Sequence, residues 1–148
     1  MSTHTQILYQ VVFSTKYRKP TLRKEDRPQL FKLIWGLMKN KRCHLYRING
    51  VEDHIHIVFA LHPSVALASL VKDIKLSATA YIKKTGIFPD FGGWQEGYGA
   101  FTYAVKAKSN LIRYVMNQEE HHRKKSSLTE YISLLEANQV EYDKQFLE

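Results

Sequence analysis

Residues 54–61 have the sequence His-Ile-His-Ile-Val-Phe-Ala-Leu, and this stretch decides the interpretation of the fold. Its β-branched and aromatic residues predict a β-strand. Side chains alternate between the two faces of a strand, so His54 and His56 leave the same face. Ile55, Ile57 and Phe59 then point to the other face, which we expect to be the core. Two imidazoles about 6–7 Å apart at their bases can converge on one metal ion.

The residues on either side of this strand predict an alternation of strands and helices. We expect strands at 7–14, 43–48 and 98–105, and helices at about 25–40, at 64–84 capped by Ser64, and at 110–123 capped by Ser109. Asn49-Gly50 is predicted to be a hairpin turn. A capping box at residues 127–130 predicts a short acidic helix at about 127–148. This order predicts an α+β fold, a ferredoxin-like or RRM-like antiparallel sheet with helices packed on one face.

The composition is that of a globular protein: 44% of the 148 residues are hydrophobic and 24% are charged. We expect one domain over residues 1–148. The single cysteine, Cys43, excludes an internal disulfide framework and a cysteine-based zinc site of the usual spacing. Apolar runs are too short for a membrane span and the polar start of the chain has no apolar signal region. We therefore expect a cytoplasmic protein.

The net charge of +8 is unevenly placed. Residues 1–50 hold eleven Lys and Arg against two acidic residues, while the remainder is close to neutral. A local basic excess is typical of a surface that meets phosphates. The residues that we expect to contact DNA flank strand ends, and Tyr17 among them can stack on an unpaired base: Lys16, Tyr17, Arg18, Lys19, Lys41 and Arg42. Trp94 is a second stacking candidate, and both aromatic residues can instead be packed.

Tyr114 and Gln118 lie four residues apart in the helix predicted at 110–123, so they are neighbours on one helix face. Both fall at the border of its apolar stripe, where a side chain can point toward a sheet without being fully buried in the core. The alternative is a tyrosine at the edge of the packing and a solvated glutamine.

Taken together, these residues predict a metal site with a nucleophile beside it. Two neutral histidines, His54 and His56, and the amide oxygen of Gln118 would hold a divalent ion, Mg²⁺ or Mn²⁺, at three positions. The open positions would take phosphate oxygens and water, so the ion could polarise a phosphodiester. Tyr114, one helical turn from Gln118, would then be the nucleophile.

Two of these motifs resemble a known family. Residues 53–59 resemble the histidine–hydrophobe–histidine motif of HUH endonucleases, and residues 114–118 resemble the tyrosine helix of IS200/IS605-type single-strand transposases. The resemblance runs in the right order from about Tyr9 to Arg123. Residues 118–123 are closer to the branch that includes the REP-associated tyrosine transposases.

The resemblance implies an enzyme that cuts and rejoins single-stranded DNA beside short hairpins without ATP. His54, His56 and Gln118 would be the metal ligands, and Tyr114 would form a 5′-phosphotyrosine and leave a 3′-OH. Members of the insertion-sequence branch are homodimers, whereas REP-associated relatives act as monomers. The resemblance therefore favours a homodimer and leaves the monomer open, and it assigns no role to the acidic C-terminal segment.

Two other functions explain part of the sequence. A non-catalytic RRM-like module would account for the charge and the aromatic residues, but not for two same-face histidines together with a Tyr-x-x-x-Gln helix. A replication-type HUH nickase would keep the chemistry, but such enzymes have larger chains. Alternation predicts that Asp53 points away from both histidines as a turn residue. His121 falls near Tyr114 on the helical wheel and is predicted to be a solvated residue at the helix end.

Overall fold

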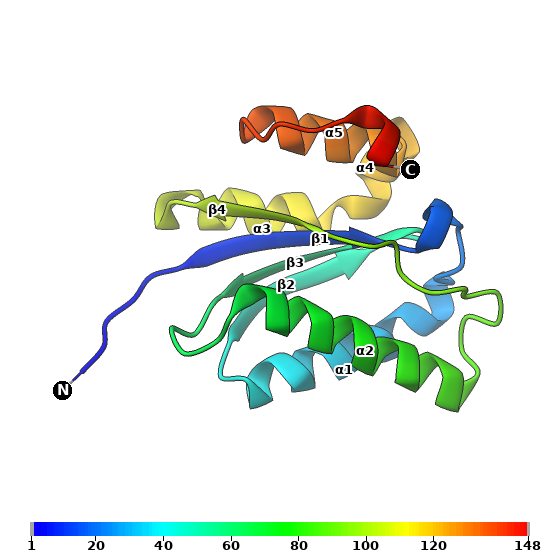
Figure 1. Cartoon of the computed structure of the whole chain (residues 1–148), viewed down its shortest axis with the longest axis horizontal. Helices are drawn as coiled ribbons and strands as arrows, with labels where there is room; N and C mark the ends of the chain where they lie inside the picture. The colour runs from blue at the N-terminus through cyan, green and yellow to red at the C-terminus, as the bar shows by residue number, and fades with distance from the viewer. Residues whose placement is uncertain (1, 148) are drawn as a thin grey trace.

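The computed structural model describes residues 2–147, and Figure 1 shows a sheet with helices on both of its sides. The strands are β1 (Leu8–Ser14), β2 (His44–Gly50), β3 (His54–Ala60) and β4 (Gly99–Tyr103). The helices are α1 (Arg27–Asn40), α2 (Leu67–Thr85), α3 (Lys108–Met116), α4 (Gln118–Lys124) and α5 (Ser127–Ala137). The sheet order is β2-β3-β1-β4, and every neighbouring pair is antiparallel. The α+β antiparallel fold expected from the sequence is confirmed.

The larger hydrophobic core lies between the sheet and helices α1 and α2. Ile55, Ile57 and Phe59 of β3 point into it, and each is at most 1% exposed, as the alternation predicted. Ile34 of α1 and Ile74 of α2 belong to the same buried cluster. Burying one such side chain contributes about 1.5–3 kcal/mol, so this layer fixes β3 and therefore the direction of its other face.

The second face of the sheet is also covered, which differs from the expectation that helices pack on one face only. Figure 1 places α3, α4 and α5 on the side opposite α1 and α2. Val58 packs there against Leu111 and Val115 of α3, and Val12 packs against Leu135 of α5. The physical reason is that the central strands β1 and β3 carry apolar side chains on both faces, and both faces must be buried.

Asn49 and Gly50 do not form the hairpin turn predicted for them, because both are paired residues at the end of β2. The connection to β3 is residues 51–53. Glycine is required at position 50 because the backbone of His54 approaches it closely: a Cβ there would lie 2.6 Å from the backbone oxygen of His54. The Asn49 amide donates to the carbonyl oxygens of Val115 and Met116, both at 3.0 Å.

The helix predicted at 110–123 is broken at Asn117 into α3 and α4. The side-chain amide of Asn49 donates to the carbonyl oxygens of Val115 and Met116. In a continuous helix these oxygens would accept hydrogen bonds from backbone N–H groups of the next turn. Two predicted caps are also wrong: α2 begins after Ala66 and α3 after Ala107, so neither Ser64 nor Ser109 caps a helix. No helix within residues 2–147 is long and apolar enough to cross a membrane.

The C-terminal helix exists, but it ends at Ala137 instead of continuing to about residue 148, and its cap lies one residue earlier than predicted. Ser126, rather than Ser127, accepts a hydrogen bond from the Thr129 backbone N–H at 3.2 Å. Glu130 is therefore the fourth residue of the helix, one position too far along to close a capping box. It lies on the buried face of α5 together with Ser127 and Leu135.

Gly50→Ala is expected to lower the free energy of unfolding by about 2 kcal/mol, because its Cβ would meet rigid backbone rather than a flexible side chain. Urea unfolding of the two proteins measures the difference. Gly36→Ala is the matched control: it lies inside α1 with nothing within 4 Å of its added Cβ, and it should stabilise by about 0.5–1 kcal/mol. Equal stability of the Gly50→Ala and native proteins would contradict the close approach.

Candidate functional site

The two histidines of β3 face α3, α4 and α5 and are almost completely buried, His54 at 2% and His56 at 0% exposure. Their ring centroids are 5.0 Å apart. The Nδ1 atom of His54 lies 2.7 Å from Oδ1 of Asp53, and Nδ1 of His56 lies 2.7 Å from Oε1 of Gln10 on β1. Since each Nδ1 is already engaged, both Nε2 atoms are left to point into the space under the helices.

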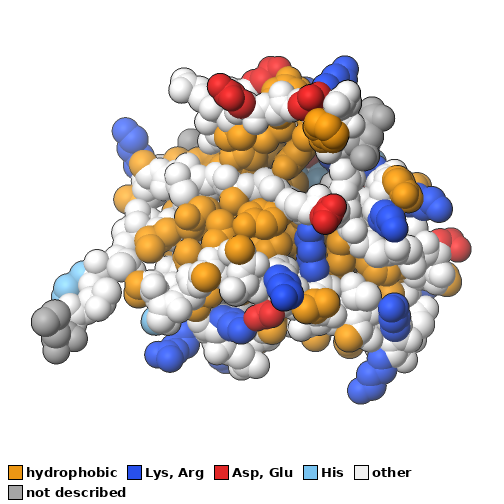
Figure 2. Space-filling view, in the orientation of Figure 1, with side chains coloured by type: hydrophobic (Ala, Val, Ile, Leu, Met, Phe, Trp, Pro, Cys, Tyr) orange, Lys and Arg blue, Asp and Glu red, His pale blue; other side chains and the backbone are white. Residues whose placement is uncertain are grey.

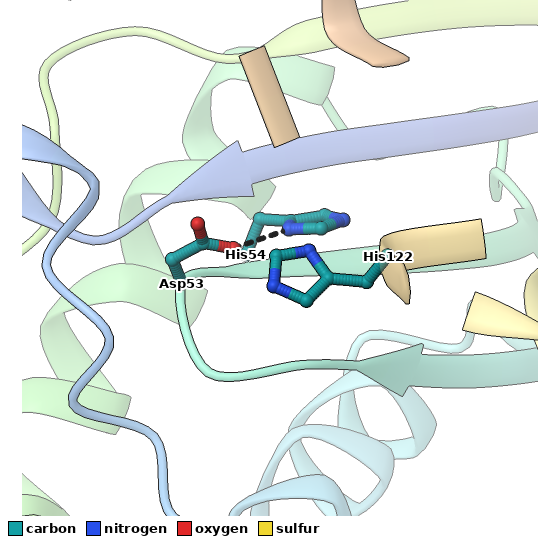
Figure 3. A group of neighbouring side chains, drawn as sticks. All are labelled: Asp53, His54 and His122. Carbon is teal, nitrogen blue, oxygen red and sulfur yellow. Dashed lines mark hydrogen bonds and ion pairs between the residues drawn. The ribbon is translucent and has the colours of Figure 1, made fainter. Parts of the chain in front are cut away.

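Asp53 contacts His54, so the prediction that it points away from the histidines is wrong. Figure 3 shows its carboxylate directed at the His54 ring. Alternation fails here because Asp53 precedes β3 and lies in the bend that connects it to β2. Its other oxygen accepts a hydrogen bond from Ser127 Oγ at 3.0 Å. The ring of His122, from α4, lies beside this pair, with its centroid 5.9 Å from that of His54.

Gln118 reaches the histidine pair although the helix that carries it is interrupted. It is the first residue of α4 and is fully buried. Its Oε1 lies 3.1 Å from Nε2 of His54, and its amide nitrogen donates to Oε2 of Glu130 at 3.2 Å. Tyr114 lies in the last turn of α3, with its ring centroid 6.0 Å from that of His56, and its hydroxyl donates to the same Oε2. The structure thus brings together the four residues predicted to form the site.

Glu130 was missed by the sequence analysis and lies at the centre of the cluster. Its Oε1 is 3.1 Å from Nε2 of His54 and 3.3 Å from Nε2 of His56, while Oε2 faces Tyr114 and Gln118. A usable signal was present: Glu130 lies four residues before Leu134, so it shares the apolar stripe of α5, where a charged side chain needs a partner.

The electrostatics follow from this burial and pairing. Burial disfavours the charged imidazolium of His54, but the hydrogen bonds and charges of Asp53 and Glu130 outweigh it and raise the pKa of His54 to about 9. Burial dominates at His56 and lowers its pKa to about 4. Burial would raise the pKa of the Glu130 carboxyl, yet its hydrogen bond to His54 holds that pKa well below its usual range. Burial and the Glu130 carboxylate both raise the pKa of Tyr114, so its phenol is protonated.

This donor set suits a divalent cation. Metal-bound histidines have one ring nitrogen on the metal and the other hydrogen-bonded to a carboxylate or carbonyl oxygen. Asp53 and Gln10 already supply those second partners. The amide oxygen of Gln118 adds an oxygen donor of the kind that Mg²⁺ and Mn²⁺ accept.

His121 is packed, which differs from the prediction of a solvated residue at the helix end. Its ring stacks on that of Tyr114, with centroids 4.6 Å apart. Its Nε2 is buried and has no hydrogen-bond partner among residues 2–147. Trp94 is packed as well, edge-on against the rings of Phe13 and Phe91.

The residues expected to contact DNA separate into two groups. Lys16, Tyr17 and Lys19 are exposed in the loop after β1, at the end of the sheet that carries His54, because Ser14 pairs with His54. Tyr17 is 71% exposed and has a positive φ of 57°.

Arg18 belongs to the same loop but turns inward. Its guanidinium donates to Ser14 Oγ at 3.0 Å, to Ser127 Oγ at 3.2 Å and to the backbone oxygen of Leu147 at 3.3 Å. Arg18 therefore connects the loop to α5 and to the end of the described chain.

Lys41 and Arg42 lie at the opposite end of the sheet, since they precede the end of β2 that pairs with Ala60. Six residue steps along β3, from His54 to Ala60, separate the two ends by about 20 Å at the rise of a strand. Lys41 forms an ion pair with Asp73 at 2.8 Å. In the view of Figure 2, Lys and Arg side chains are most numerous over the α1 and α2 layer, and acidic side chains gather over α5.

Two solved structures have a fold similar to that of this chain. A candidate transposase from Deinococcus radiodurans R1 is 20% identical, with a TM-score of 0.63, and the alignment covers 80% of this chain and 95% of that one. A REP-associated tyrosine transposase bound to a REP hairpin is 15% identical, with a TM-score of 0.62, over 82% of this chain and 74% of that one. At these identities the likeness shows a shared fold. No curated protein matches the sequence significantly.

The family comparison covers most of the chain and includes the residues of the site up to Gln118. The model for the family described as "Transposase IS200 like" matches residues 3–118. The chain therefore belongs to the IS200-like transposase family.

Proposed function

We propose that this transposase cuts and rejoins single-stranded DNA through a 5′-phosphotyrosine formed on Tyr114. The observation that carries the proposal is the convergence of Tyr114 and Gln118 with His54 and His56 on one buried point. Family membership supports the strand-transfer reaction, and the similar fold of a transposase bound to a REP hairpin supports a hairpin-containing DNA partner.

His54, His56 and Gln118 would hold Mg²⁺ or Mn²⁺. When bound, such an ion would draw charge from a phosphate oxygen and so help the phosphorus accept a nucleophile. Asp53 and Gln10 fix the two imidazole rings through Nδ1 and keep both Nε2 atoms turned toward the site. The ligands are therefore positioned before any metal arrives, which reduces the cost of binding.

Tyr114 would supply the nucleophilic oxygen. Its hydroxyl is held in the cluster by Glu130, and the His121 ring stacks on the phenol. In the reaction the phenol oxygen bonds to phosphorus, the bond from phosphorus to the 3′ oxygen breaks, and the net transfer of the phenol proton to that leaving oxygen gives a 3′-OH. The phosphotyrosine retains the energy of the broken phosphodiester, so a 3′-OH can reverse the step without ATP.

The structure argues against the RRM-like alternative. Such a module binds nucleic acid on the open face of its sheet. Here α1 and α2 cover one face, and α3, α4 and α5 cover the other. The family match to IS200-like transposases favours transposition over the replication-type nickase. The homodimer stays a prediction, as do the single domain over residues 1–148 and the DNA-contact roles of Lys41 and Arg42.

Tyr114→Phe is expected to abolish strand cleavage, a loss of about 1,000-fold or more, because it removes the attacking oxygen and almost no packing volume. The assay uses Mn²⁺ and labelled single-stranded oligonucleotides from the DNA that flanks the gene, with the covalent adduct detected on denaturing gels and mapped by peptide analysis. DNA binding should be unchanged.

Tyr98→Phe is the matched control, since Tyr98 is also partly exposed and removing its hydroxyl should leave cleavage intact. An adduct mapped to Tyr98 or Tyr103, or an active Tyr114→Phe protein, would rule out Tyr114 as the nucleophile.

Charge reversal at Lys16 and Lys19 together should weaken DNA binding and reduce the slope of log K against log salt by about two, because each lysine is expected to neutralise one phosphate. Fluorescence anisotropy at several salt concentrations measures both quantities. The same charge change at Lys32 and Lys72, which are exposed on α1 and α2, is the control and should have a smaller effect. Identical slopes for both double variants would place the DNA elsewhere.

A further inference from the structure

Glu130 occupies a position in the site that the family match does not cover. The matched segment ends at residue 118, whereas Glu130 comes from α5. Glu130 is nevertheless only 7% exposed, and its carboxylate reaches all four residues of the proposed site. A buried carboxylate that contacts two imidazoles, an amide and a phenol needs a physical explanation, because burying a charge without compensation is costly.

The spacing of the donor atoms is that of neighbouring ligands on one small cation. Mg²⁺ takes octahedral ligands at about 2.1 Å, so adjacent ligand atoms lie about 3.0 Å apart. Oε1 of Glu130 is 3.1 Å from Nε2 of His54 and 3.3 Å from Nε2 of His56. Oε1 of Gln118 is likewise 3.1 Å from Nε2 of His54. Oε1 of Glu130 is thus spaced from Nε2 of His54 as Oε1 of Gln118 is.

The hydrogen bonds leave no proton between Nε2 of His56 and Oε1 of Glu130 while His56 is neutral. His56 donates its Nδ1–H to Gln10 Oε1, because the Gln10 amide nitrogen is committed to the Tyr103 hydroxyl at 2.8 Å. Its Nε2 then presents a lone pair to Oε1 of Glu130, which is also an acceptor. Two acceptors directed at one another are stabilised by a cation between them.

Charge balance points the same way. His54, His56 and Gln118 are neutral when they act as ligands, so a divalent ion held by them alone would keep its full charge in a buried site. A carboxylate would offset half of that charge. The second oxygen of Glu130 is already used, since it accepts from Tyr114 and Gln118, and this leaves Oε1 free to face the ion.

We propose that Glu130 is a fourth protein ligand of the metal ion, supplied by the C-terminal helix α5. This inference rests on the proposed function, which places a metal on His54, His56 and Gln118. It adds that the site is completed by a segment beyond the family-matched part of the chain, and that one carboxylate joins the metal position to the tyrosine hydroxyl.

In the competing interpretation, Glu130 does not strengthen metal binding. If the carboxylate only fills the site in the metal-free protein, an incoming ion must displace it, and removing it would leave binding unchanged or make it tighter. If it is a ligand, its removal weakens binding. Mn²⁺ affinity, measured without DNA and without reference to cleavage, separates the two.

The experiment titrates Mn²⁺ into the chelator-treated full chain by isothermal calorimetry, with the loss of the free Mn²⁺ electron paramagnetic resonance signal as a second readout. We expect one ion per chain. Glu130→Ala should weaken binding roughly 100-fold and the isosteric Glu130→Gln roughly tenfold, because the alanine loses the donor and the glutamine loses only its charge. Glu136→Gln, on the exposed side of the same helix, should match the unmodified chain.

His54→Ala distinguishes failure of this inference from failure of the proposed function. If His54→Ala loses Mn²⁺ while both Glu130 variants bind as tightly as the unmodified chain or more tightly, Glu130 is not a ligand and the proposed metal site stands. If His54→Ala binds normally, or the unmodified chain takes up no Mn²⁺, both proposals fall. Circular dichroism checks folding, and Glu130→Gln preserves the shape of the side chain should the alanine variant unfold.

Discussion

The structure depends on one constraint: two imidazole rings are buried on the same face of β3, and their ring nitrogens must find partners there. An unpaired buried polar group costs about 1–3 kcal/mol, so leaving these nitrogens unsatisfied would consume much of the stability of a small domain. The partners come from separate parts of the chain: Gln10 on β1, Asp53 before β3, Gln118 on α4 and Glu130 on α5. The second helical layer is therefore tied to the sheet by polar contacts as well as by its apolar side chains, and the site forms where those contacts meet.

What could be predicted from the sequence was local in origin. Alternation along β3 gave the faces of His54 and Ile55 correctly, because a strand has a period of two wherever it is paired. The spacing of Tyr114 and Gln118 gave their proximity, although for a helix that the structure breaks between them. The break depends on Asn49, 66 and 67 residues away from the carbonyls that it binds. No local pattern contains that contact. The Asn49-Gly50 pair instead predicted a hairpin turn that the structure does not form.

The errors at the site were also errors of a single residue. With the cap at Ser126 instead of Ser127, Glu130 is one position too far along the helix to close a capping box, and it lies with Ser127 and Leu135 on the buried face. Two consecutive serines are equally good caps by composition, and only packing against the sheet chooses between them. Asp53 was misplaced for a related reason, because alternation was applied one residue before the strand began. Buried carboxylates at element boundaries are thus the residues that pattern reasoning is least able to orient.

The charge pattern identified a basic region but not the separate functions of its members. Lys16 and Lys19 remain exposed after β1, whereas Arg18 between them binds Ser127. Ser127 in turn donates to Asp53, and Asp53 holds Nδ1 of His54. A continuous series of hydrogen bonds therefore runs from the loop that we expect to contact DNA, through the start of α5, to a proposed metal ligand. Because α5 also carries Glu130, a displacement of this loop would act on both sides of the His54 ring at once. The DNA-facing loop and the chemistry of the site are in this way parts of one bonded unit, which a tally of surface charges does not reveal.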